Sequence, residues 1–141
     1  MNGNTAEGSV TVRIRARLMH AMLRVADMDR TLAFYCDVLG MSVQMSRTDP
    51  NGYRNVFIGY GPAVSHTLLE FGCMPGVTTY DKGTAFDHIA FEVGELAETC
   101  AHLRTQGVTF VRDIKTAHSG ALIAIIQDPD GYRIELVQPK A

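Results

Sequence analysis

The sequence predicts an α+β fold of two paired βαβββ modules that form a curled mixed sheet, and two observations lead to this prediction. First, the chain contains a weak internal repeat, in which residues 18–25 and 86–93 each form an apolar run with a histidine near its start. Second, each run is followed by a helix-like stretch that ends at a glycine, and each half ends in a strand that carries a glutamate. The repeat of roughly 65 to 70 residues is longer than solenoid units, so duplication of a small module explains it better.

Three regions are expected along the chain. Residues 1–16 are interpreted as a flexible N-terminal extension, because Asn, Gly, Thr, Ser and Glu dominate until the apolar run at Leu18 begins. Residues 17–84 form the first module and residues 85–141 form the second. The total length of 141 residues suits one compact domain or two intimate half-domains.

In the first module, we expect a strand over residues 18–26 and a helix over residues 31–40. An aspartate in the segment 27–30 can cap the start of this helix, and Gly40 is a typical helix stop. Three strands should follow, separated by turns rich in glycine, proline and asparagine, and a loop over residues 72–84 closes the module. The three expected strands cover residues 43–45, 53–60 and 66–71.

The second module is expected to repeat this order. Residues 96–107 are predicted to form a helix that ends at a glycine, and a strand beginning at Val108 follows. The last two strands, over residues 121–127 and 132–137, are joined by the Asp-Pro-Asp-Gly segment at 128–131. This composition favours a tight reversal, because proline fixes φ and glycine accepts a positive φ.

Four side chains at matching positions of the two halves suggest one divalent metal site. They are His20 and Glu70 in the first half, and His88 and Glu135 in the second. Strand residues alternate between faces, so the histidine and glutamate of each half can converge on the concave side of a curled sheet. Two imidazoles and two carboxylates suit Zn²⁺, Ni²⁺, Co²⁺, Mn²⁺ or Fe²⁺. A single strand histidine is more often half-buried without a ligand role, but four residues in register favour a metal site.

The composition argues against several other partners. A net charge of −2 provides no basic stripe, so we expect no nucleic acid partner. No apolar run approaches the ~20 residues of a membrane span, and the polar N-terminus does not resemble a secretory signal, so we expect a soluble cytoplasmic protein. Cys36, Cys73 and Cys100 are odd in number and far apart, which indicates reduced, buried thiols rather than a disulfide framework.

Several motifs, spread over nearly the whole chain after Arg17, carry a resemblance to a known family. They are Arg-Leu-Met-His20-Ala-Met-Leu-Arg24-Val, Phe34-Tyr35, Val38-Leu-Gly-Met41, Phe57-Ile-Gly-Tyr-Gly-Pro62, Leu69-Glu70, Gly83-Thr-Ala-Phe-Asp-His88-Ile-Ala and Asp128-Pro-Asp-Gly-Tyr-Arg-Ile-Glu135-Leu. With these motifs the chain resembles glyoxalase I, the lactoylglutathione lyase of the vicinal oxygen chelate superfamily. Under this resemblance, the two histidines and two glutamates match all four metal-ligand positions of the family.

The resemblance implies an enzyme that isomerises the hemithioacetal of methylglyoxal and glutathione to S-D-lactoylglutathione, a route of methylglyoxal detoxification. A carbon-bound proton beside a carbonyl is weakly acidic, so this reaction needs a base in contact with the proton. It also needs a cation that holds the two vicinal oxygens of the developing enediolate. In the family a metal-associated glutamate serves as the base, which implies Glu135 as the catalytic base and Glu70 as its symmetric catalytic partner.

The resemblance also implies an assembly and a metal. In the family's usual homodimer, His20 and Glu70 would face the His88 and Glu135 pair of the other chain, which gives two sites at the interface. The residues alone are also compatible with a monomer folded on itself. The compact length resembles the class activated by nickel or cobalt, so one Ni²⁺ or Co²⁺ per site is favoured over Zn²⁺.

The resemblance is less complete at the positions that bind the thiol. Arg24 matches the family arginine that binds the γ-glutamyl carboxylate, and a guanidinium fork suits this task. Met74 stands where the family commonly has asparagine. Ala117 occupies the place of an expected basic residue, and Lys115 and His118 are the candidates to replace it. Another thiol, such as trypanothione, is therefore an alternative to glutathione.

Other members of the superfamily offer further alternatives. Methylmalonyl-CoA epimerases have glutamine at the second ligand position, where this chain has Glu70. This difference disfavours an epimerase. Extradiol dioxygenases and fosfomycin-modifying enzymes use three protein ligands, whereas this chain offers four. A non-enzymatic binding member is the least favoured alternative, because it would be expected to lose the ligands altogether.

Overall fold

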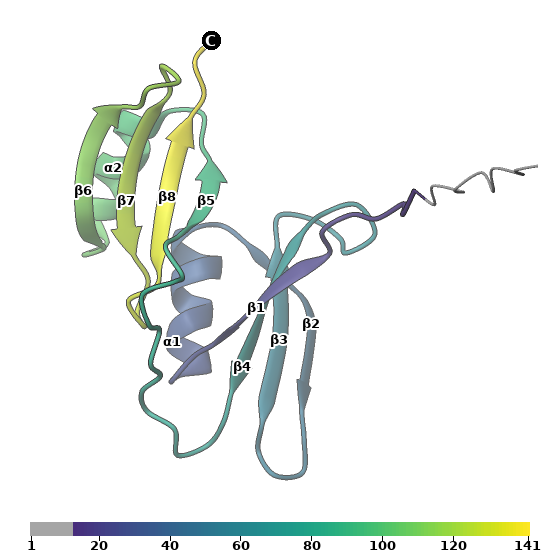
Figure 1. The fold of residues 1–141 in the computed structure, drawn as a ribbon. Helices are drawn as coiled ribbons and strands as arrows, with labels where there is room; N and C mark the ends of the chain where they lie inside the picture. Colours follow the sequence, from purple (N-terminus) through teal and green to yellow (C-terminus); the bar gives the residue numbers. More distant parts are fainter. Residues whose placement is uncertain (1–12) are drawn as a thin grey trace, which may run out of the picture.

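The order of strands and helices repeats once along the chain, as the sequence does. The computed structural model describes residues 13–141 and contains two four-stranded sheets (Figure 1). The extension expected over residues 1–16 lies mostly outside the described residues, and residues 13–19 precede the first strand without regular secondary structure. None of the helices in the described part is long and apolar enough to cross a membrane.

The first sheet contains β1 (His20–Arg24), β2 (Ser42–Thr48), β3 (Arg54–Gly59) and β4 (Leu68–Cys73), in the spatial order β1-β4-β3-β2. β1 is parallel to β4, and the other neighbours are antiparallel. Because a parallel neighbour requires a crossover connection, the chain passes through a helix and two strands before it returns beside β1. The strands predicted for this half are confirmed, with bounds that differ by a few residues.

The second sheet contains β5 (Ile89–Glu92), β6 (Thr109–Thr116), β7 (Leu122–Gln127) and β8 (Arg133–Gln138), in the order β5-β8-β7-β6. β5 is parallel to β8 and the other neighbours are antiparallel, so the topology of the first sheet is repeated. The α+β prediction of two paired βαβββ units is therefore confirmed. β6 extends further than its sequence suggests, because pairing with the apolar β7 continues the strand through charged residues.

One helical segment follows β1. α1 (Met28–Leu32) begins after Asp27, whose Oδ1 accepts a hydrogen bond from the backbone amide of Arg30 at 3.0 Å, so the expected aspartate cap is confirmed. The segment continues as the π-helical η1 (Ala33–Val38) and stops before Gly40, which has a φ of 77°. Glycine accepts this left-handed conformation at little cost, which explains the helix stop. The wider π-helical turns were not expected from the sequence.

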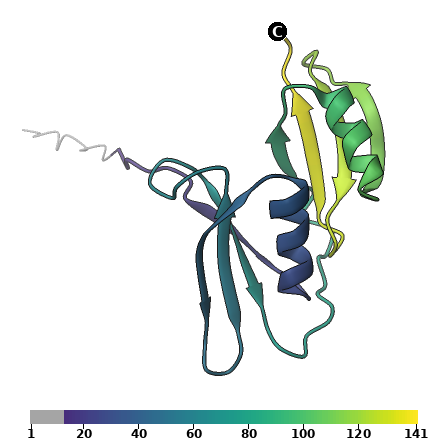
Figure 2. The same ribbon diagram turned by 180° about the vertical axis from the view of Figure 1, so that it is seen from behind.

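The other helix, α2 (Leu96–Thr105), covers the second sheet, as Figure 2 shows from behind. Its buried residues are Leu96, Cys100 and Leu103, which recur at helical spacing on one face. The helix predicted over residues 96–107 is thus confirmed, and it ends two residues earlier than predicted.

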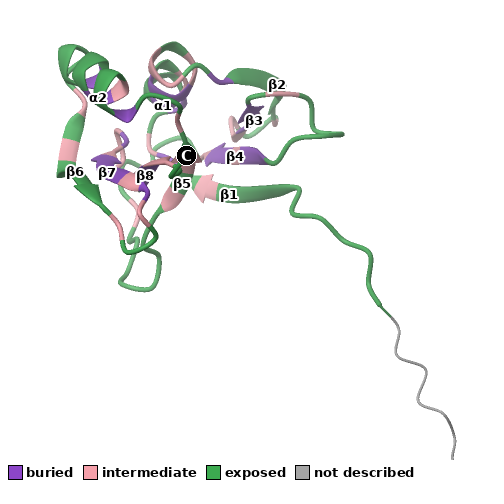
Figure 3. Cartoon of the chain, turned by 90° about the horizontal axis from the view of Figure 1, so that it is seen from above, coloured by how far each residue is buried: buried purple, intermediate pink, exposed green. Residues whose placement is uncertain are grey.

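A single hydrophobic core joins the two modules. It contains Met28, Tyr35 and Phe71 from the first module together with Leu103 and Ile134 from the second. Figure 3 shows the buried residues on the inner strands β3, β4, β7 and β8, whereas β1, β2 and β6 are largely exposed. Most side chains of β1, β2 and β6, which are outer strands of the two sheets, are therefore exposed to solvent.

The turn between β7 and β8 is anchored to the first module by a buried hydrogen bond. The hydroxyl of Tyr35 donates to Oδ2 of Asp128 at 2.9 Å, and both residues are buried. Burial raises the pKa of Tyr35 and also that of Asp128. The other oxygen of Asp128 accepts from the backbone amides of Asp130 and Tyr132 at 2.9 and 2.8 Å, which shapes the turn itself.

Two more contacts bind the same turn to the end of β1. The backbone amide of Ala26 donates to Oδ1 of Asp130 at 3.0 Å, and the hydroxyl of Tyr132 donates to the carbonyl of Arg24 at 2.7 Å. The Asp-Pro-Asp-Gly segment is therefore more than a hairpin turn, because its side chains fix one module against the other.

Removing the Tyr35 hydroxyl should destabilise the protein measurably. Tyr35→Phe leaves a buried carboxylate oxygen of Asp128 without this donor, so we expect the free energy of unfolding to fall by about 1–3 kcal/mol. Urea denaturation of the two proteins measures this difference. Tyr60→Phe is the matched control, because the Tyr60 hydroxyl donates to the Leu39 carbonyl at an exposed position. Equal losses in the two variants would contradict the role given to the buried contact.

Candidate functional site

His20 and Glu70 lie next to each other on adjacent strands of the first sheet. In the parallel pairing of β1 and β4, Met22 lies opposite Glu70, and His20 lies two residues earlier on the same face. Nε2 of His20 is 3.1 Å from Oε2 of Glu70. The two side chains are 40% and 18% exposed, so the pair is accessible from solvent.

Two residues of β3 hold this pair in place. Asn55 is buried and donates from Nδ2 to Oε1 of Glu70 at 2.8 Å. The ring of Phe57 packs edge-on against the His20 imidazole, with ring centroids 5.2 Å apart. Sequence reasoning missed both residues. The one sequence signal for Asn55 is a polar residue next to the apolar run Val-Phe-Ile, because a buried asparagine needs a hydrogen-bond partner.

His88 and Glu135 form the equivalent pair in the second sheet. Ala90 lies opposite Glu135 in the parallel pairing of β5 and β8, which repeats the register found in the first sheet. His88 lies immediately before β5, and its Nε2 is 3.7 Å from Oε2 of Glu135. The side chains are 31% and 20% exposed. Each module thus presents one imidazole and one carboxylate from matching positions.

Asp87 contacts the other nitrogen of the His88 ring. Its Oδ2 is 2.5 Å from Nδ1 of His88, and this hydrogen bond is the main cause of a lowered pKa of Asp87. Its Oδ1 is 3.9 Å from the guanidinium of Arg133. Sequence reasoning did not single out Asp87, because its position beside a histidine in sequence does not reveal where the side chain points.

The structure forms these two pairs but does not bring all four residues together within one chain. Among residues 13–141, no group of three or more His, Cys, Asp or Glu side chains could hold a metal ion. Within residues 13–141 the two pairs belong to separate sheets, so the structure does not show the single-chain arrangement that the sequence left open.

Each pair nevertheless fits half of a divalent metal site. Imidazole nitrogen and carboxylate oxygen are donors that borderline divalent metals accept, and each pair supplies both types without a thiolate. Each pair supplies two donors, one nitrogen and one oxygen, and two such pairs would make a four-donor set.

Arg24 and Met74 line one cavity of about 420 Å³, together with Tyr53 and Tyr80. The positions matched to thiol recognition in the sequence thus lie around a common space. In contrast, Lys115 lies near the end of β6, Ala117 and His118 lie in the turn between β6 and β7, and none of the three lines this cavity.

The three cysteines are unpaired in the part of the chain that the structure describes. Cys100 is buried, whereas Cys36 and Cys73 are half-buried. Burial raises the pKa of the Cys36 and Cys100 thiols, which makes both poor nucleophiles at neutral pH. None of them lies in either histidine–glutamate pair.

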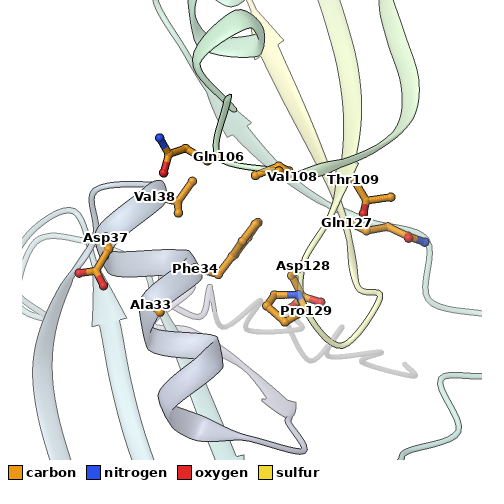
Figure 4. A pocket seen from close by; sticks show the side chains of 11 residues that line it. Ala33, Phe34, Asp37, Val38, Gln106, Val108, Thr109, Gln127, Asp128 and Pro129 are labelled. Atoms are coloured by element: carbon orange, nitrogen blue, oxygen red, sulfur yellow. The ribbon is translucent and has the colours of Figure 1, made fainter. Parts of the chain in front are cut away.

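A separate cavity of about 360 Å³ lies between η1 and the second module (Figure 4). Phe34, Val38 and Val108 line it, and none of the predicted site residues does. The carboxylate of Asp128 at its edge is already engaged by Tyr35. This cavity therefore lies apart from both histidine–glutamate pairs.

Comparison with known proteins identifies the family to which the chain is similar. A family model described as Glyoxalase/Bleomycin resistance protein/Dioxygenase superfamily matches residues 17–136, which include both pairs. The lactoylglutathione lyase of Salmonella typhimurium is 41% identical to this chain over 126 residues, covering 88% of this chain and 93% of that protein.

Two solved structures share the fold at high sequence identity. The trypanothione-dependent glyoxalase I of Leishmania major has a TM-score of 0.79 and 40% identity, covering 88% of this chain and 87% of that chain. Glyoxalase I of Zea mays has a TM-score of 0.83 and 35% identity, covering 89% of this chain but 45% of the maize chain. The family match, the shared fold and the duplicated pairs show that the chain belongs to the Glyoxalase/Bleomycin resistance protein/Dioxygenase superfamily.

Proposed function

We propose that this chain is a metal-dependent lactoylglutathione lyase, which isomerises the hemithioacetal of methylglyoxal and glutathione to S-D-lactoylglutathione. The observation that carries the proposal is the duplicated histidine–glutamate pair, with nitrogen–oxygen distances of 3.1 and 3.7 Å at matching strand positions. The relatives with this activity in their names match the chain over most of its length. Residues 17–84 and 85–141 are the two modules of this enzyme, which acts in the cytoplasm.

The proposed metal site is shared between two copies of the chain. His20 and Glu70 of one copy bind one side of the ion, and the second pair of the other copy binds the opposite side. Three observations support this assembly: each chain presents two half-sites, the outer strands are open, and large apolar side chains are exposed there. The exposed apolar residues are Met19, Met22, Val43, Met45, Val111 and Ile114. The maize chain, of which this chain covers 45%, is also long enough for a second pair of modules.

The reaction moves one proton between adjacent carbons of the substrate. When bound, the divalent metal supplies Lewis acidity that stabilises negative charge on the two vicinal substrate oxygens. Glu135 takes the proton from the first carbon and delivers it to the second, so one C–H bond breaks and another forms. His20 and His88 act as neutral imidazoles, because a protonated ring has no lone pair to offer a metal.

The contacts around the two glutamates support Glu135 as the base and Glu70 as its catalytic partner. The amide of Asn55 holds one oxygen of Glu70 at 2.8 Å, which restrains that side chain. Glu135 has no comparable side-chain donor among the described residues, and its Oε2 lies 3.7 Å from Nε2 of His88. A base that must approach and leave the substrate carbon benefits from this freedom.

The proposed thiol is glutathione, with Arg24 as the binding group for its γ-glutamyl carboxylate. An arginine fork suits a carboxylate, and Arg24 lines the cavity of about 420 Å³. Met74 in the same cavity, and the similarity to the trypanothione-dependent enzyme of Leishmania major, favour trypanothione as the second candidate. An epimerase or dioxygenase is less well supported, because both glutamates take part in the paired arrangement.

Reconstitution with single metals tests the proposed activity. We expect metal-stripped protein to form S-lactoylglutathione from methylglyoxal and glutathione after addition of Ni²⁺ or Co²⁺, and much less after Zn²⁺. The absorbance of the thioester product measures the rate, and a parallel assay with trypanothione tests the second thiol. Stoichiometric metal binding without product from either thiol would contradict the proposed reaction while leaving the metal site in place.

Replacing the proposed base should abolish turnover without unfolding the protein. Glu135→Gln removes the proton acceptor and weakens a metal ligand, so we expect kcat to fall at least ~100-fold. Glu98→Gln is the control, because Glu98 is exposed on α2 and lies outside both pairs. Steady-state kinetics and circular dichroism of both variants make the comparison. Near-normal turnover by Glu135→Gln would refute the assigned role.

Mixing two inactive variants tests whether the site is shared. His20→Ala and His88→Ala should each be inactive, since each variant damages both sites of its own dimer. Unfolding and refolding the two together in equal amounts produces mixed dimers in which one site keeps all four ligands. We expect activity to recover to about one quarter of the unmodified value. No recovery, with mixed dimers verified by native mass spectrometry, would mean that the site is not shared.

A further inference from the structure

The two histidines of the proposed site differ in the contacts of Nδ1, the ring nitrogen that faces away from the paired glutamate. In the internal repeat, the residue before His20 is Met19, and the residue before His88 is Asp87. The His20 ring is held by edge-on packing against Phe57. Among residues 13–141, the one carboxylate paired with His20 is Glu70, which contacts Nε2 and not Nδ1. The His88 ring, in contrast, has a carboxylate on each side.

Polar and charged groups lie on both sides of the His88 ring. The guanidinium of Arg133 lies 3.9 Å from Oδ1 of Asp87, and Oδ2 of Asp87 lies 2.5 Å from Nδ1 of His88. On the opposite side of the ring, Nε2 faces Oε2 of Glu135 at 3.7 Å. Arg133 and Glu135 are two residues apart on β8, so both point to the face on which His88 lies.

This arrangement decides which ring nitrogen carries the proton. An ionised aspartate can only accept hydrogen bonds, so Nδ1 of His88 must be the donor. In the neutral imidazole the other nitrogen then keeps its lone pair. That nitrogen is Nε2, which faces Glu135 and is the atom required for a metal bond.

We propose that Asp87 is a positioning residue, which holds His88 in the Nδ1-protonated tautomer and aims its Nε2 lone pair at the metal. The proposal rests on the metal site described under the proposed function, and it assigns this support to the second half-site alone. No carboxylate of the described residues contacts Nδ1 of His20, whose ring packs edge-on against Phe57. A carboxylate behind a metal-binding histidine fixes the ring and raises its basicity as a ligand.

The exposure of Asp87 separates this role from a structural one. Its side chain is 71% exposed, and exposed ion pairs contribute little to stability. Loss of Asp87 should therefore change metal binding strongly while leaving the unfolding transition nearly unchanged. A residue needed only for folding would produce the opposite pattern.

Metal titration of the full-length protein tests the proposal without an activity assay. We expect Asp87→Ala to weaken Ni²⁺ and Co²⁺ binding by ~10- to 100-fold in competition with a chromophoric chelator. Asp87→Asn should recover much of this affinity, because its amide oxygen can still accept from Nδ1. Asp113→Ala is the matched control, since Asp113 is 79% exposed, lies in the same module and pairs with Arg104.

Nitrogen NMR of the histidine rings provides a second readout in the metal-free protein. We expect Nδ1 of His88 to carry the proton in the unmodified protein and in Asp113→Ala. In Asp87→Ala, the Nε2-protonated tautomer should gain population. His20 should be unaffected in all three proteins, because its ring has no contact with Asp87 in the chain.

The outcomes distinguish this inference from the proposed reaction. Weaker metal binding and a changed tautomer in Asp87→Ala would support the positioning role even if the protein formed no S-lactoylglutathione. Metal affinity within twofold of the unmodified value, with an unchanged His88 tautomer, would overturn the role and leave the proposed lyase activity standing. An equal loss of metal affinity in Asp113→Ala would also overturn the role. The loss would then come from removing one negative charge anywhere in the module, and not from the contact with His88.

Discussion

The parallel pairing of the first and last strands of each module is the constraint on which the candidate site depends. In both sheets, the residue two positions after the histidine lies opposite the glutamate, as Met22 faces Glu70 and Ala90 faces Glu135. Side chains two residues apart on a strand share a face, so this register brings each imidazole to its carboxylate. A slip of one residue would turn the histidine to the other face and separate the pair.

The junction between the modules depends on polar contacts within an otherwise apolar core. The turn between β7 and β8 reaches the first module through Asp128, which accepts from Tyr35, and through Tyr132, which donates to the carbonyl of Arg24. These buried groups satisfy each other, so neither module can move away without leaving unpaired polar atoms. The contact also fixes the end of β1, the strand that carries His20 and Arg24.

The two histidine–glutamate pairs have the same candidate ligands, but different residues contact them. In the first, a buried amide restrains the carboxylate, since Asn55 binds Glu70. In the second, a carboxylate restrains the imidazole, since Asp87 binds His88. No side-chain donor among the described residues restrains Glu135 in the way that Asn55 restrains Glu70. The internal repeat matches the candidate ligands of the two halves, whereas the residues that contact them differ. This division is consistent with a site in which one half holds the metal and the other also supplies the moving base.

The sequence by itself determined the repeated βαβββ order and the four candidate ligands, because apolar periodicity, turn residues and the internal repeat are local signals. It could not show that the four candidate residues form two separate pairs in the described part of the chain, since that depends on how the sheets are divided and packed. Nor could it identify Asn55, Asp87 or the Tyr35–Asp128 bond. The direction of a side chain, and the partner it meets from a distant strand, are set only when the tertiary structure forms.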